Sequence, residues 1–245
     1  MNLQSFSGLP SRYRNAISEA IAVIETRFNP LGIVVTGTII RGHPHATSDL
    51  DIVVIHRETW RQRIQIWCGD VPAEIFVNSA PWIERAFQTD TETARPVMIG
   101  MLSTGVIIKD TDNVLVDLVI RARELFDAGP QASELLTTPW RYGIASLLED
   151  AGDIRNEDMA LSSAMVTEAL LDAIRYSFVT SGIWIPREKA LLRTFYEERP
   201  DLAQATRAAL GSDLNLRFDL SKMCIESLIG TSGFFPWESP VQELP

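Results

Sequence analysis

The sequence predicts an α+β protein, in which an α/β domain at the N-terminus is followed by an all-helical domain. Residues 1–112 alternate between helical patterns and short β-branched runs, whereas residues 113–230 show helical periodicity almost throughout. Residues 231–245 carry several prolines and no periodicity, so we expect an irregular tail. The chain has 245 residues, 46% of them hydrophobic, which is enough to bury a core in both domains.

The N-terminal domain is expected to begin with a helix and to continue mainly as strands. Apolar residues at helical spacing span residues 11–28, and Asn29-Pro30 ends the pattern. Single strands are expected at residues 32–37, 48–55 and 105–110. Residues 61–80 are expected to form a hairpin of two strands that turns near Gly69-Asp70. Shorter helical patterns cover residues 81–88 and 92–102.

The C-terminal domain is expected to consist of helices. The pattern over residues 113–130 stops at Gly129-Pro130, a combination that ends helices. Longer helical patterns follow at residues 140–154, 157–181, 186–198, 201–210 and 213–228. The stretch "GIWIP", residues 182–186, carries the one further strand signal.

Charge and cysteine content limit the partners and the compartment. The formal net charge is −10, from 32 acidic and 22 basic residues, which disfavours nucleic acid and anionic membranes as partners. Cys68 and Cys224 lie far apart without metal-ligand spacing, so neither a zinc knuckle nor a disulfide framework is expected. The sequence shows no export signal and no transmembrane stretch, and we expect a cytoplasmic protein.

A pair of aspartates suggests a metal site. Asp49 and Asp51 are separated by one residue, Leu50, in a strand pattern. Their side chains are therefore expected to lie on the same face of the strand. Magnesium prefers hard oxygen ligands of this kind and completes its shell with water and phosphate oxygens. Glu74 lies in the second strand of the hairpin and becomes a third acid if that hairpin pairs beside the aspartates. Two aspartates at this spacing are more often part of an ordinary surface turn than of a metal site, so the inference depends on the combination with the neighbouring strands and Glu74.

The order of these features resembles the polymerase β-like nucleotidyltransferase superfamily. The stretch "GTIIRGHPHATSDLDIVV" is similar to its small-molecule branch, which includes aminoglycoside and lincosamide nucleotidyltransferases. The resemblance covers residues 34–54 together with Glu74, and the helical remainder resembles the second domain of kanamycin-type enzymes only in general organisation. It implies a nucleotidyltransferase domain with a mixed sheet.

The resemblance also assigns roles near the start of the motif. Gly37 lets the backbone approach a phosphate closely, because it has no Cβ. Thr38 stands where serine is commoner and keeps a hydroxyl that can bond a phosphate oxygen. Arg41 is expected to pair with a phosphate, with the orientation of a carboxylate as its alternative role.

The implied reaction is transfer of a nucleoside monophosphate, expected to be AMP, from a nucleoside triphosphate to a hydroxyl of a small molecule. Asp49 and Asp51 would hold two Mg²⁺ ions. Glu74 would either share the second ion or act as general base, and Glu149 and Asp150 are alternative bases from the helical domain.

Two cationic residues of the helical domain are candidates for binding the triphosphate tail of the nucleotide. Lys189 and Arg193 lie four residues apart in a helical pattern after Pro186, so they are expected to share a face. Similar second domains present a lysine to the β- and γ-phosphates. The alternative is an exposed helix face on which these cations pair with Glu188 or Glu197.

Other functions remain open on the sequence alone. A toxin-type relative would modify a protein or a tRNA, although the acidic net charge argues against tRNA. A non-catalytic, antitoxin-like nucleotide-binding module is the alternative outside enzymes, and the presence of all three acids argues against it. The acceptor, the preferred base and the oligomeric state, including a homodimer, stay undetermined.

Overall fold

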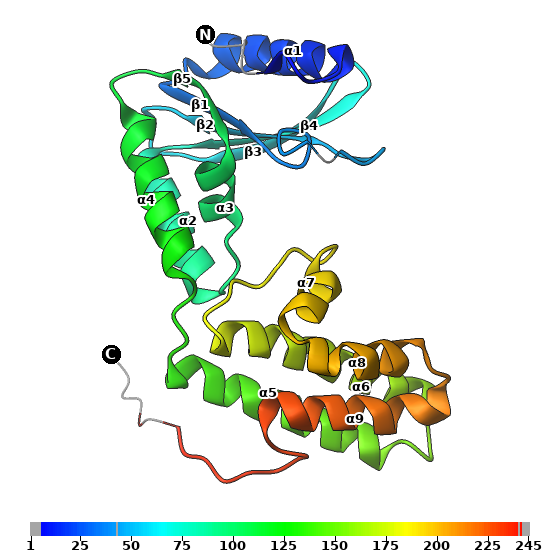
Figure 1. Ribbon diagram of the computed structural model, residues 1–245. Helices are drawn as coiled ribbons and strands as arrows, with labels where there is room; N and C mark the ends of the chain where they lie inside the picture. The colour runs from blue at the N-terminus through cyan, green and yellow to red at the C-terminus, as the bar shows by residue number, and fades with distance from the viewer. Residues whose placement is uncertain (1–5, 43, 240, 242–245) are drawn as a thin grey trace. The chain divides into compact units, whose positions relative to one another are not determined.

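The computed structural model describes residues 6–42, 44–239 and 241, and its chain divides between Gly129 and Pro130 into two compact units (Figure 1). The N-terminal unit combines a mixed sheet with helices, and the C-terminal unit is built from helices. The predicted α+β class is confirmed. The N-terminal unit includes residues 113–129, which the sequence analysis assigned to the helical domain.

The sheet of the N-terminal unit has five strands in the order β3-β4-β2-β1-β5. The strands are β1 (Gly32–Thr36), β2 (Leu50–Ile55), β3 (Gln62–Cys68), β4 (Val71–Asn78) and β5 (Val106–Asp110). β2 and β4 run parallel, and the other three neighbouring pairs run antiparallel. The expected hairpin between β3 and β4 is therefore present, and it places β4 directly beside β2.

Helices cover both faces of this sheet (Figure 1). They are α1 (Ser11–Phe28) on one face, and α2 (Ala80–Glu92), α3 (Val97–Thr104) and α4 (Val114–Ala128) on the other. Leu50, Ile52 and Val54 of β2 belong to the core under α1. Because side chains alternate along a strand, Asp51 and Val53 face the opposite side of the sheet. The start of α4 is fixed to β5, since Asp110 Oδ1 accepts the Leu115 N–H at 3.0 Å.

A buried aspartate joins α2 to α3. Asp90 is 6% exposed, and its Oδ2 accepts the Ile99 N–H at 2.8 Å near the start of α3. Burial raises the pKa of Asp90 to about 6, although the N–H groups of Ile99, Met98 and Val97 act in the opposite direction. The folded protein therefore holds a proton on this carboxyl more tightly than the unfolded chain does.

This shift predicts a pH dependence of stability. Because the folded-state pKa lies above the unfolded value, the contribution of Asp90 grows as pH falls through the folded pKa and is lost as pH rises. Relative to Asp90→Asn, whose side chain does not titrate, the wild-type free energy of unfolding should gain about 1.4 kcal/mol between about pH 7.5 and about pH 5. Urea unfolding at the two pH values measures this difference. Equal changes in both proteins would contradict it.

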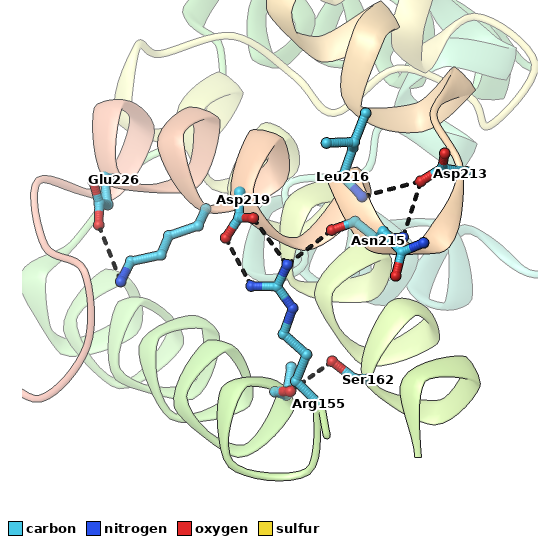
Figure 2. A network of polar contacts seen from close by, with 9 residues as sticks. Arg155, Ser162, Asp213, Asn215, Leu216, Asp219 and Glu226 are labelled. Atoms are coloured by element: carbon cyan, nitrogen blue, oxygen red, sulfur yellow. Dashed lines mark hydrogen bonds and ion pairs between the residues drawn. The ribbon is translucent and has the colours of Figure 1, made fainter. Parts of the chain in front are cut away.

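The C-terminal unit contains helices α5 (Glu134–Asp153), α6 (Met159–Thr180), α7 (Leu191–Glu198), α8 (Pro200–Gly211) and α9 (Leu214–Ile229). Figure 2 shows one of the polar contacts that join them. Arg155, just after α5, donates to both carboxylate oxygens of Asp219 at 2.8 and 2.9 Å and to the Asn215 carbonyl oxygen at 2.8 Å. Asp213 caps the start of α9 by accepting the N–H groups of Asn215 and Leu216.

Two sequence expectations in this unit are wrong. Residues 186–190 are not helical, because the Ala190 N–H bonds the Arg187 carbonyl oxygen in a turn and α7 begins only at Leu191. Residues 182–186 form no strand. In addition, α5 begins several residues earlier than expected and includes Pro139.

The described part of the tail is irregular but packs on α5. The Phe234 N–H donates to Glu149 Oε1 at 3.0 Å, and the Arg141 guanidinium lies 4.4 Å from the centre of the Phe235 ring. Tyr142 and Trp237 are also in ring contact. In the part of the chain that the structure describes, none of the helices has the length and apolar character needed to cross a membrane.

Candidate metal centre

Three carboxylates lie together on the face of the sheet opposite α1. One oxygen each of Asp49, Asp51 and Glu74 lies within 4.8 Å of the other two. Asp51 and Glu74 are direct partners in the parallel β2–β4 pair, and Asp49 lies just before β2. Asp51 and Glu74 are each only 7% exposed. The structure therefore brings together the three acids that the sequence analysis singled out.

The turn after β1 contacts this cluster. Thr36 pairs with Asp51 across β1 and β2, and the next residue, Gly37, has a φ of +94°. A Cβ added at Gly37 would lie 2.6 Å from Asp51 Oδ2. Glycine is thus required here both by the backbone conformation and by the aspartate beside it. From the sequence, Gly37 was expected to let the backbone approach a phosphate, and its close approach to Asp51 is a second reason for glycine that only the structure shows.

The turn continues to Arg41, with Ile39 buried in the core. The Arg41 N–H bonds the Gly37 carbonyl oxygen at 3.2 Å, so residues 37–41 close a single helical turn. Thr38 is half-buried at its start, and Arg41 is exposed at its end. The first N–H groups of a helical turn have no partner within that turn, and such groups are typical donors to bound anions.

Two residues of β3 hold Glu74, and sequence reasoning missed both. The Arg63 Nε and the Gln65 Nε2 donate to the same oxygen, Glu74 Oε1, the latter at 3.1 Å. The Arg63 bond lowers the pKa of Glu74, burial opposes it, and the Gln65 bond lowers it further. Glu74 is therefore a carboxylate at neutral pH and a poor proton acceptor, which favours a role as metal ligand over a role as general base.

The charge of Glu74 in turn raises the pKa of Arg63, chiefly through the same bond, with smaller contributions from the charges of Asp51 and Asp49. The sequence signal for this contact was the spacing of Arg63 and Gln65 in "RQRIQIW", which puts both on one strand face. Only the pairing of Gln65 with Glu74 across β3 and β4 shows that this face meets the acids.

The donor set fits a hard divalent cation. All three side chains offer carboxylate oxygens, and neither cysteine belongs to the cluster, because Cys68 and Cys224 are buried elsewhere. Two of the three carboxylates, Asp51 and Glu74, are largely buried, and a cation bound among the three would stabilise their negative charges. The cluster could therefore hold a divalent metal ion.

The candidate residues of the C-terminal unit are not arranged as the sequence suggested. Lys189 lies in the turn before α7 and Arg193 lies on the helix itself, so the expected common helix face is absent, although both are exposed. Glu188 pairs with Arg175 at 3.1 Å. Glu149 anchors the tail through Phe234, which gives it a structural role. The proposed roles of these residues toward a nucleotide stay predictions.

Comparison with known proteins supports the fold. No protein-family model and no curated protein sequence matches the chain. Among solved structures, it is similar to a nucleotidyltransferase-like protein from Exiguobacterium sibiricum 255-15, with a TM-score of 0.55 and 14% sequence identity over 89% of this chain and 74% of that chain. The chain thus has the fold of a nucleotidyltransferase-like protein.

Proposed function

We propose that the protein is a metal-dependent nucleotidyltransferase that moves AMP from ATP to a hydroxyl group of a small molecule and releases pyrophosphate. The observation that carries this proposal is the cluster of Asp49, Asp51 and Glu74, which lies against the Gly37 turn in a fold of this class. Carboxylates that can hold metal ions, next to a turn proposed to bind phosphate, suit phosphoryl and nucleotidyl transfer.

The residues of the N-terminal unit have three different proposed roles. Asp49, Asp51 and Glu74 would hold Mg²⁺, and the bound metal supplies positive charge to the triphosphate and lowers the pKa of the attacking hydroxyl. The turn amides and the Thr38 hydroxyl bind phosphate oxygens, and Arg41 adds a charge-assisted contact. Arg63 and Gln65 keep Glu74 ionised and fix its orientation.

The transfer is a single displacement at the α-phosphorus. The acceptor oxygen forms a bond to phosphorus, the bond to the bridging oxygen breaks, and that oxygen leaves on pyrophosphate with the electron pair. The proton of the acceptor hydroxyl passes to solvent. No covalent intermediate on the protein is needed, and Glu74 does not act as the base.

Labelling of a cell lysate tests the function and the class of acceptor together. Purified protein, Mg²⁺ and ATP labelled at the α-phosphate are incubated with lysate, and the products are separated into small molecules, proteins and RNA. We expect label among the small molecules, and label placed at the γ-phosphate should leave as pyrophosphate. Label in protein or RNA would instead support a toxin-type target. Absence of label from all three fractions would contradict the proposed enzymatic activity.

In the C-terminal unit, Lys189 and Arg193 are proposed to contact the β- and γ-phosphates. Lys189→Ala should then raise the KM for ATP about tenfold with little change in kcat, because a charge-assisted bond to phosphate is lost. Lys222→Ala is the matched control, since Lys222 also lies in this unit and pairs with Glu226 at 3.9 Å. Equal KM values for the two variants would refute the role of Lys189.

A further inference from the structure

The carboxyl ends of β2 and β4 leave the sheet side by side. Ile55 lies opposite Asn78 in this parallel pair, and the His56 N–H bonds the Asn78 carbonyl oxygen at 3.0 Å. The segment after β2 and the start of α2 after β4 therefore lie together at one edge of the sheet. Glu74 of the carboxylate cluster lies five residues before Ser79, or about 17 Å away along β4. This edge is thus separate from the candidate metal centre.

A cavity of about 320 Å³ lies at this edge. Residues 57–59, which follow β2, line one part of it, and Ser79, Pro81, Trp82 and Arg85 from the start of α2 line the rest. A volume of this size is at the lower end of the range for small-molecule sites. The cavity can therefore admit a small ligand.

Ser79 faces this cavity with an unused hydroxyl. It is the N-cap residue of α2 and is only 7% exposed, yet its side chain makes no capping bond. Asp158 and Asp213, by contrast, cap α6 and α9 through their side chains. A polar side chain buried to this extent normally has a hydrogen-bond partner. The helix start adds partial positive charge at the same place, so an anion is the partner that this position favours.

Three arginines surround the cavity. Arg57 and Arg85 line it directly. The guanidinium carbons of Arg61 and Arg85 lie 4.4 and 5.4 Å from the centre of the Trp82 ring, which keeps both cations beside the cavity. All three arginines are exposed. Although the chain as a whole has a net charge of −10, this edge therefore carries a group of positive charges.

The neighbouring acids offset these charges only in part. Glu58 also lines the cavity, and Asp112 pairs with Arg57 at 3.1 Å. The two side chains of that pair are 73% and 67% exposed, and ion pairs so exposed to solvent are weak. The pair also occupies one N–H of a guanidinium that has five. Arg57 can thus donate to a ligand without losing Asp112.

We propose that this cavity is a second anion site, which binds a phosphate group, either as inorganic phosphate or as the monoester of a small molecule. The Arg57 and Arg85 guanidinium groups donate to the phosphate oxygens, and the Ser79 hydroxyl donates from the helix start. Pro81 and Trp82 offer apolar surface to the organic part of a monoester. This site does not depend on the proposed transfer reaction, and it lies away from the Gly37 turn.

Calorimetric titration with inorganic phosphate and with glycerol 3-phosphate tests the site. The titration is done in EDTA without nucleotide, so that any metal is removed from the three carboxylates near the Gly37 turn and their charges repel an anion there. Arg85→Gln should raise the Kd of both ligands about tenfold, and Glu58→Gln should lower it about threefold. Arg123→Gln, which removes an exposed arginine from α4, is the matched control and should leave Kd unchanged.

Ser79→Ala separates ligand binding from helix capping. Because the Ser79 hydroxyl makes no capping bond, this variant should keep the wild-type melting temperature without phosphate, while its Kd for phosphate rises about fivefold. Asp213→Ala should show the opposite behaviour, with a lower melting temperature and an unchanged Kd, because Asp213 caps α9. A Ser79→Ala protein that binds phosphate as the wild type does would overturn the role of the hydroxyl.

The remaining outcomes decide whether the site exists. Saturable binding of either ligand that weakens in Arg85→Gln but not in Arg123→Gln would support it. Absence of binding to the wild type up to about 10 mM ligand would overturn it. Binding that is lost in Thr38→Ala and kept in Arg85→Gln would place the phosphate at the Gly37 turn and would also overturn it. Since none of these measurements uses AMP transfer, failure of the proposed function would not affect them.

Discussion

Asp51→Asn is expected to lower kcat for AMP transfer by about a thousandfold, because the proposed metal site loses a charged ligand and with it several kcal/mol of transition-state stabilisation. Asparagine has nearly the same shape as aspartate, so it fits the buried position beside Gly37 and the fold should persist. The measurement is steady-state release of pyrophosphate at saturating Mg²⁺ and ATP.

Asp70→Asn is the matched control for this change. Asp70 is an exposed acid in the turn between β3 and β4, outside the cluster of three carboxylates, and its loss should leave kcat unchanged. A second measurement does not depend on activity. Mg²⁺ should raise the melting temperature of the wild type and of Asp70→Asn but not that of Asp51→Asn. An Asp51→Asn protein with full activity would remove the basis of the proposed function.

Gly37→Ala should damage both the stability and the activity of the protein. The φ of +94° is unfavourable for alanine, and its Cβ would lie 2.6 Å from Asp51 Oδ2, so either the turn or the carboxylate must move. We expect the free energy of unfolding to fall by about 2 to 4 kcal/mol and kcat to fall by about a hundredfold or more. Urea unfolding and pyrophosphate release measure the two effects.

Gly42→Ala separates backbone strain from the contact with Asp51. Gly42 also has a positive φ, +82°, but an added Cβ there meets no atom within 4 Å. It should therefore cost about 1 to 2 kcal/mol of stability and leave kcat nearly intact. If the two variants lose the same stability and the same activity, the close approach of Gly37 to Asp51 has no special importance.

The common face of the two aspartates could be predicted because its determinant is local, the alternation of Asp49, Leu50 and Asp51 along one strand. The place of Glu74 beside them was predicted only on the condition that the β3–β4 hairpin pairs with β2, and the structure shows that pairing. The contacts of Arg63 and Gln65 could not be predicted in the same way. They depend on the register between β3 and β4, and a shift of one residue would have turned both side chains to the other face.

The errors in the C-terminal unit also have a physical cause. The spacing of apolar residues around Leu191 and Phe195 correctly indicates a helix, but periodicity does not show where the first turn begins. The chain enters α7 through a separate turn that includes Lys189, so the expected alignment with Arg193 fails. Periodicity likewise predicted α4 but not the core that it joins. In the structure α4 belongs to the N-terminal unit, where Leu115 is fully buried and its N–H bonds Asp110 Oδ1.

The parallel pairing of β2 with β4 has a consequence for how the protein is made. β2 carries one carboxylate of the central pair and β4 the other, and the chain passes through all of β3 between them. Neighbouring parallel strands cannot form from a single tight turn, so Asp51 and Glu74 meet only when the β3–β4 hairpin docks on β2. A nascent or partly folded chain therefore carries these two acids but not the cluster, and the complete site exists only after the sheet has been assembled.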